Sequence, residues 1–278
     1  MGVIQPAWGS ILHLQLAAEL SGLCRERNLY LVPYNIHKSD EVSDILRMLR
    51  HKPHEERLVL NGLTMELTLR LGARLQAEGY RHLLIGPDAV GFTGASVYPD
   101  QDEEANRILS YLTELGHERI VFIVNEPRGL MVTSKRAEAV RNQIAARGLS
   151  KASIVWCDTA NFEDSFEPAY RKAREILSVK PWPTAIVPLS GIGAWAVLRY
   201  AMEQRIEVPG QLSIVGFDPT INAAQLPVAL TEMSFPFSDC ARVAMDLLWS
   251  DSRVPVHTNI KSELVLRKSS GPPPVDTL

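Results

Sequence analysis

Residues 208–218, VPGQLSIVGFD, decide the fold class of this chain. Pro209 and Gly210 end a helical pattern, and the apolar run at 212–217 is too short for a helix, so it predicts a buried strand. Asp218 stands at the carboxyl end of that strand. Ligands bind at the carboxyl ends of strands in open parallel α/β sheets. Asp218 is therefore either a ligand contact or a residue that caps the following turn.

Short apolar runs alternate with helical patterns on both sides of this stretch. The runs predict strands at 3–5, 30–34, 58–60, 82–85, 95–98, 119–124, 154–157 and 185–189, then extended segments at 230–235 and 256–267. The helical patterns predict helices at 10–27, 40–49, 64–77, 102–115, 133–147, 165–177, 191–204 and 238–249. This alternation predicts an α/β protein with two doubly wound parallel-sheet lobes and a ligand cleft between them. We expect the Pro-rich tail after Arg267 to be frayed.

The composition excludes several classes of protein. The chain has 278 residues, of which 46% are hydrophobic and 22% charged, as in globular proteins that fold in water. A net charge of -3 argues against a broad nucleic-acid-binding face on this segment. The three cysteines lack metal-ligand spacing and indicate reduced thiols in a cytoplasmic protein. The sequence contains neither a signal peptide nor an apolar run of membrane-spanning length, so we expect no membrane association.

Catalytic motifs are absent from the sequence. It contains no Walker A loop, GxGxxG, HExxH or GxSxG, and we predict no enzymatic activity, no cofactor and no metal site. An enzyme stays open as an alternative because catalytic triads assemble through space. His51 and His54, beside Glu55 and Glu56, form either a metal site or a solvated charged loop; the ordinary exposure of these residue types favours the loop.

Three further segments, together with the opening stretch, carry a family resemblance. They are DQDEEANRILSYLTELGHERIVFI at 100–123, SKRAEAVRNQIAARGL at 134–149, and LTEMSFPFSDCARVAMDLL at 230–248. In this order and spacing the chain, from Val3 to about Pro273, resembles the effector-binding core of the LacI/GalR family of bacterial transcription regulators.

The resemblance implies an N-terminal lobe of residues 1–100 plus 235–251 and a C-terminal lobe of 101–234 plus 252–278, joined by three crossovers. It also implies a homodimer. A small effector, most often a sugar or nucleobase, would control binding to operator DNA through a helix-turn-helix domain that is not in this sequence. Because the chain opens inside an apparent strand, we expect an upstream segment in the complete protein.

The resemblance also assigns ligand-binding positions in the second lobe. Asp218 matches the acidic residue that accepts hydrogen bonds from effector hydroxyls, and Arg136 matches the Arg that reaches into the cleft. The alternative for Arg136 is a surface position on its helix. Phe162 or Trp156 would stack on the ligand, unless it packs in the core. Ser190 and Phe235 stand where many members have Asn and Gln.

In the first lobe, AWGSILHL at 7–14 occupies the loop that faces the effector in the family. Its candidate ligand-binding residues are Trp8, Ser10, Leu12 and His13. Trp8 is either a stacking platform or a shield for a helix end, and His13 is either a donor to the effector or a partly buried His satisfied within the protein.

Several family positions depart from the usual pattern. The Asn-Asp pair before the helix at 191–204 is Ser190-Gly191 here, and the Asp-Arg after the strand at 82–85 is Gly86-Pro87. The predicted ligand is therefore a sugar or related metabolite that need not be an ordinary hexose. The sequence predicts a cytoplasmic regulator core; a periplasmic sugar-binding protein of a transporter, which shares the fold, is the alternative.

Overall fold

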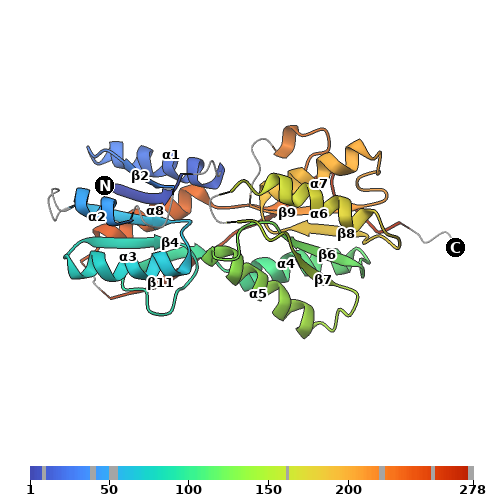
Figure 1. The fold of residues 1–278 in the computed structure, drawn as a ribbon, viewed down its shortest axis with the longest axis horizontal. Helices are drawn as coiled ribbons and strands as arrows, with labels where there is room; N and C mark the ends of the chain where they lie inside the picture. The colour runs from blue at the N-terminus through green and yellow to red at the C-terminus, as the bar shows by residue number, and fades with distance from the viewer. Residues whose placement is uncertain are drawn as a thin grey trace. The chain divides into compact units, whose positions relative to one another are not determined.

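The chain folds into two α/β units, each built on a six-stranded sheet (Figure 1). The computed structural model describes residues 1–7, 11–37, 42–49, 56–160, 163–218, 223–251 and 254–274, without the side chains of Ile11 and Val42. Unit 1 comprises Met1–Asp100, Gly129–Val132 and Pro236–Lys261, and unit 2 comprises Gln101–Arg128, Thr133–Phe235 and Ser262–Leu278.

The sheet of unit 1 is parallel and has the order β11-β5-β4-β3-β1-β2. Its strands are β1 (Gly2–Pro6), β2 (Val32–Ile36), β3 (Arg57–Asn61), β4 (Arg81–Ile85), β5 (Ala95–Pro99) and β11 (His257–Ile260). Its helices are α1 (Ile11–Glu26), α2 (Val42–Leu49), α3 (Met65–Ala77) and α8 (Phe237–Trp249). Helices α1 and α8 pack against each other, although they are distant in the sequence.

The sheet of unit 2 has the order β12-β10-β9-β8-β6-β7 and is parallel except for its edge strand β12. Its strands are β6 (Ile120–Val124), β7 (Ser153–Trp156), β8 (Ala185–Pro188), β9 (Ser213–Phe217), β10 (Thr231–Met233) and β12 (Leu264–Val265). The helices are α4 (Gln101–Glu114), α5 (Met131–Ala146), α6 (Phe166–Leu177) and α7 (Gly191–Glu203), with a short 3₁₀ turn at Ala223–Gln225.

Alternating side chains of the central strands of unit 2 enter two apolar clusters. Phe122, Val187 and Phe217 belong to the cluster that includes buried residues of α4 and α5. Ile186 and Ile214 belong to the cluster that includes buried residues of α6 and α7. Because successive side chains of a strand point to opposite faces, strands of a sheet covered by helices on both sides are apolar along most of their length. The run at 212–217 fits this pattern except at Ser213, whose buried hydroxyl donates to the carbonyl oxygen of Gly271.

The two sheets share one strand order, with the chain reversing direction across the sheet between β1 and β3 in unit 1 and between β6 and β8 in unit 2. The predicted fold class, two doubly wound parallel-sheet lobes, is confirmed. In such sheets the strand ends at the reversal leave a crevice, because the loops on either side run to opposite faces.

Several predicted elements were misplaced. The strand predicted at 30–34 lies at Val32–Ile36, where Val32 pairs with Gly2 of β1. The single extended run predicted at 256–267 is two strands in two sheets, since β11 pairs with β5 and β12 with β10. Residues 252–261, predicted for the second lobe, therefore belong to unit 1.

The beginning of the tail is anchored rather than frayed. Ser269 is fully buried and donates to the carbonyl oxygen of Ile214 at 2.6 Å. The carbonyl oxygen of Gly271 accepts from Ser213 Oγ at 3.0 Å and lies 2.9 Å from His117 Nε2. Residues 275–278 lie outside the described part of the chain.

Candidate functional site

Polar residues gather in unit 2 where β6, β8 and β9 end. Asn125 and Glu126 follow β6, Ser190 follows β8 by two residues, and Asp218 follows β9 directly. Asp218 has a φ of 59°, a left-handed conformation that Asp tolerates better than most residues and that turns the chain out of the strand. The reversal of strand order thus coincides with a cluster of polar residues that includes two predicted ligand-binding residues, Ser190 and Asp218.

Arg136, on α5, makes a two-pronged ion pair with Asp218. Its Nη1 donates to Asp218 Oδ2 at 2.8 Å and its Nη2 to Asp218 Oδ1 at 3.0 Å. The guanidinium carbon of Arg136 lies 4.6 Å from the ring centroid of Phe217, the last residue of β9, which directly precedes Asp218. The Arg136 side chain is 2% exposed and that of Asp218 is 16% exposed, so the carboxylate is the solvent-facing member of the pair.

Three further acceptors surround the Arg136 guanidinium. The carbonyl oxygen of Leu189, at the end of β8, accepts from Nη1 at 2.8 Å. Gln101 Oε1 accepts from Nε at 2.9 Å, and Glu104 Oε2 lies 3.8 Å from Nη2. Since a buried cation is tolerated only with charged and hydrogen-bonding partners, this set explains how an Arg is held almost without exposure.

Two carboxyl groups beside this pair are shifted toward the protonated form. Burial raises the pKa of Glu104 to about 7; Arg136 opposes that shift and the Asp218 carboxylate adds to it. Burial also raises the pKa of Glu126, and the hydrogen bonds from Ser165 and Ser190 oppose this shift. Ser165 Oγ donates to Glu126 Oε1 at 2.8 Å.

Ser190 ties the end of β8 to the start of α7. Its hydroxyl is the N-cap of α7, accepting from the backbone N–H of Gly193, and it also accepts from Asn125 Nδ2 at 2.6 Å. A Cβ at position 193 would lie 2.6 Å from Asn125 Oδ1. Gly193 is therefore required for Asn125 to pack under the first turn of the helix.

The other predicted ligand-binding residues lie in different surroundings. Leu12 is partly exposed at the start of α1, while His13 is 7% and Phe235 5% exposed. Trp156 is stacked under the Arg128 guanidinium, 4.1 Å from its ring centroid. Trp8, Ser10 and Phe162 lie outside the described residues, as do His51 and His54. These assignments stay predictions.

Four residues of the cluster escaped the sequence analysis. Asn125 and Glu126 directly follow a buried strand, the same signal that singled out Asp218. Gln101 and Glu104 lie at helical spacing with Ala105 and other apolar residues on the buried face of α4. A polar residue on the apolar stripe of an amphipathic helix indicates a buried partner, so this signal was present in the sequence.

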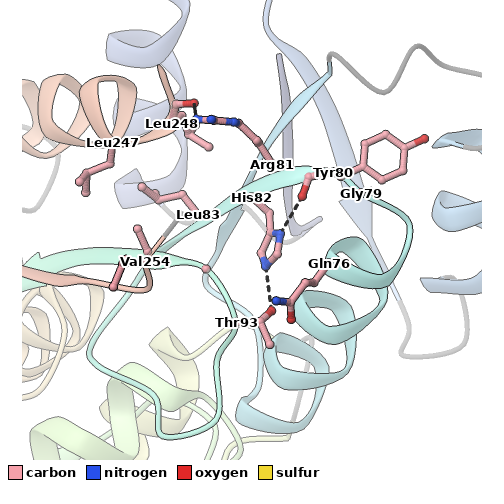
Figure 2. A pocket seen from close by; sticks show the side chains of 12 residues that line it. Gln76, Gly79, Tyr80, Arg81, His82, Leu83, Thr93, Leu247, Leu248 and Val254 are labelled. Atoms are coloured by element: carbon pink, nitrogen blue, oxygen red, sulfur yellow. Dashed lines mark hydrogen bonds between the residues drawn. The ribbon is translucent and has the colours of Figure 1, made fainter. Parts of the chain in front are cut away.

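Unit 1 contains a pocket of about 180 Å³ at the amino-terminal ends of two strands of its sheet, where β4 and β5 begin (Figure 2). The His82 ring spans it: Nδ1 lies 3.1 Å from the carbonyl oxygen of Tyr80 and Nε2 lies 3.0 Å from Thr93 Oγ1. Because a carbonyl only accepts, Nδ1 carries the proton and Nε2 accepts from Thr93. Arg81 donates to the carbonyl oxygens of Leu248 and Ser250 at the end of α8. These polar groups already bind within the protein, and we assign no ligand here.

No helix within the described residues combines the length and the hydropathy needed to span a membrane. The described residues also contain no group of three or more His, Cys, Asp or Glu that could hold a metal ion.

The family of periplasmic binding protein-like domains matches residues 109–270. The "HTH-type transcriptional repressor PurR" of Edwardsiella ictaluri is 31% identical over 62% of this chain and 50% of the relative. The repressor of the same name from Yersinia enterocolitica is 26% identical over 88% of this chain and 72% of the relative. The chain thus spans about half the length of several of the curated relatives it matches.

Solved structures agree on the fold. The LacI family transcriptional regulator CCPA of Weissella paramesenteroides, with bound glucose, has a TM-score of 0.84 at 18% identity and covers 98% of both chains. A LacI transcriptional regulator from a Rhodococcus species has a TM-score of 0.80 at 22% identity, again covering 98% of both chains. Fold and site together define a periplasmic binding protein-like domain, and the chain belongs to that family. Within it, the chain is similar to curated relatives named as HTH-type transcriptional repressors and shares the fold of the LacI family regulators above.

Proposed function

We propose that the chain is the effector-binding and dimerisation core of a bacterial transcriptional regulator that acts in the cytoplasm without catalytic activity. A small molecule, a sugar or related metabolite, binds at a site that includes Asp218. When this molecule binds, it changes how tightly a DNA-binding domain outside this sequence binds operator DNA. Binding shifts the population of conformations because the effector has different affinities for them.

The observation that carries this proposal is the Arg136–Asp218 pair at the strand ends of unit 2. The buried guanidinium holds Asp218 in a fixed orientation, and the carboxylate remains the more exposed partner. A carboxylate pre-oriented in this way accepts hydrogen bonds from ligand hydroxyl or amino groups without further ordering cost.

The same geometry favours one class of ligand. The Arg136 guanidinium is engaged by protein acceptors, and the exposed group is an anion. An uncharged polyhydroxy compound fits such a site better than a phosphate or carboxylate, because an anionic ligand would meet the negative charge of Asp218.

A thermal-shift screen of sugars, sugar acids, polyols and nucleobases tests the proposal. A ligand that binds only the folded chain raises its melting temperature. For a compound that does so, Asp218→Asn and Arg136→Lys should weaken binding by about 1–3 kcal/mol in calorimetric titration, because each removes part of a charged hydrogen-bond pair. Unchanged affinity in both variants would remove the pair from the site.

The matched control is Asp158→Asn. Asp158 is also left-handed, also pairs with an Arg stacked on an aromatic ring, and also lies in unit 2, but its side chain is 73% exposed. Its replacement should leave ligand affinity unchanged.

The fold is shared with periplasmic sugar-binding proteins of transporters, which remain the alternative class. The matched curated relatives are named as transcriptional regulators, and this supports the regulator.

A further inference from the structure

Two carboxyl groups lie against one buried guanidinium in unit 2. Asp218 takes both Nη atoms of Arg136 in short contacts, while Glu104 Oε2 stands 3.8 Å from Nη2. Arg136 and Glu104 are each 2% exposed, so water screens their interaction little. One cation cannot neutralise two carboxylates. Ionisation is therefore less favourable for Glu104, which lacks the short contact with Arg136.

Gln101 links the two competing groups. Its Oε1 accepts from Arg136 Nε at 2.9 Å, and its Nε2 donates to Glu104 Oε2 at 2.8 Å. Gln101 and Glu104 both lie in the first turn of α4. The Gln101 side chain hydrogen-bonds to both groups and so holds Glu104 close to the Arg136 guanidinium. A closing of the 3.8 Å gap therefore needs only a small displacement.

We propose that Glu104 is the reserve counter-ion of Arg136: when hydrogen bonds from a ligand to Asp218 weaken its pair with the guanidinium, Arg136 pairs with Glu104, which loses its proton to solvent. The inference deepens the proposed function, on which it rests for the ligand. It assigns Glu104 as a positioning residue whose ionisation is coupled to occupancy of Asp218, so that ligand binding near neutral pH releases a proton.

The surroundings of Glu104 support this coupling. Four neighbours act on its ionisation: Arg136 from α5, Asp218 from the end of β9, Gln101 from its own helix, and Ser262 from the segment after β11. Arg136 lowers its pKa and Asp218 raises it, while Gln101 and Ser262 donate hydrogen bonds that favour the carboxylate. Burial is the largest effect and holds the pKa at about 7, where a change of partner decides the charge.

The test follows the Glu104 carboxyl carbon by NMR in the full chain labelled with ¹³C-glutamate, without any ligand. Glu104→Gln identifies the signal by its loss, and through-bond assignment replaces this variant if it does not fold. Asp218→Asn imitates a weakened pair by removing the charge of Asp218 beside Arg136. The wild-type signal should titrate near pH 7, and in Asp218→Asn its midpoint should fall by roughly one pH unit or more, because the guanidinium becomes available to Glu104.

Asp158→Asn is the control and should leave the Glu104 midpoint in place, and Asp218→Ser serves as the second variant if Asp218→Asn unfolds. A wild-type midpoint near 4.5, or a midpoint that does not move when Asp218 is neutralised, would overturn the inference. Because the titration needs no effector, its failure leaves the effector screen unaffected. A screen in which no compound binds would contradict the proposed function, but it would not change the titration midpoint measured for Glu104.

Discussion

Among single residues, His13 of unit 1 shows how burial controls charge. Its side chain is 7% exposed, and this burial lowers its pKa from 6.5 to about 4. Between these two values the unfolded chain binds the proton and the folded chain does not. The residue therefore makes stability depend on pH between these two values.

We expect the free energy of unfolding to fall as the pH is lowered from 6.5 to 4, with a contribution from His13 on the order of 3 kcal/mol. His13→Gln should remove this contribution, and urea unfolding of wild type and variant across that range measures it. His37→Gln, at an exposed position, is the control. Stability curves of wild type and His13→Gln that run parallel between pH 4 and 6.5 would contradict the expected effect.

Sequence patterns reached only part of the site at this scale. Asp218 and Arg136 were singled out by a strand end and a family resemblance, and the structure joins them across 82 positions of sequence. Glu104 was missed because its helix was predicted from Asp102 and Gly116 at its ends, without regard to the polar residues on its buried face. The partner of a buried polar group is set by tertiary packing, which helical periodicity does not contain.

Among the elements, the turn from β3 to α3 depends on Gly62. Its φ is +66°, and a Cβ there would overlap the His13 ring. Gly148, at the end of α5, has a φ of +63° and has no heavy atom within 4 Å of where a Cβ would stand. The two glycines thus share a backbone conformation and differ in what lies beside them.

Gly62→Ala should destabilise the chain by more than Gly148→Ala, which bears only the left-handed strain of about 1 kcal/mol. Combining Gly62→Ala with His13→Ala should recover part of the difference, because the overlapping ring is then absent. Urea unfolding of the single and double variants measures the cycle. Equal losses for the two glycine variants would show that the His13 contact contributes nothing.

Strand positions were predicted well in the buried centre of each sheet, whereas three of the four edge strands, β2, β11 and β12, were misplaced. The strand at 212–217 was found because its residues are apolar except for Ser213, whereas β2 is an edge strand that contains Pro33 and Asn35. Pro is tolerated at an edge because its missing N–H faces no neighbour there. The break between β11 and β12 was missed because the run at 256–267 keeps its extended character while it passes between units.

For the whole molecule, both units repeat one strand order, and candidate groups lie at the reversal of that order in unit 2. In unit 2 the reversal between β6 and β8 carries Asn125, Glu126 and Ser190. The strand alternation predicted this class of fold, but the order of strands was not predicted, because many orders satisfy the same alternation.

Self-association of the whole molecule is a further prediction. On α7, Trp195 is 41% and Met202 45% exposed, and Trp195 lies 5.1 Å from Phe166 of α6. Apolar groups exposed together on a helix favour contact with another protein surface. We expect a dimer in sedimentation at micromolar concentration, weakened by Trp195→Asp; a wild-type monomer would count against the regulator.

The measurement that tests the central claim most directly is a thermal-shift screen of sugars, sugar acids, polyols and nucleobases on wild type, Asp218→Asn and Asp158→Asn in parallel. We predict that at least one uncharged polyhydroxy compound raises the melting temperature of wild type and of Asp158→Asn, and that the rise is reduced or lost in Asp218→Asn. A rise of equal size in all three proteins, or no rise with any compound, would contradict the assignment of Asp218 to an effector site.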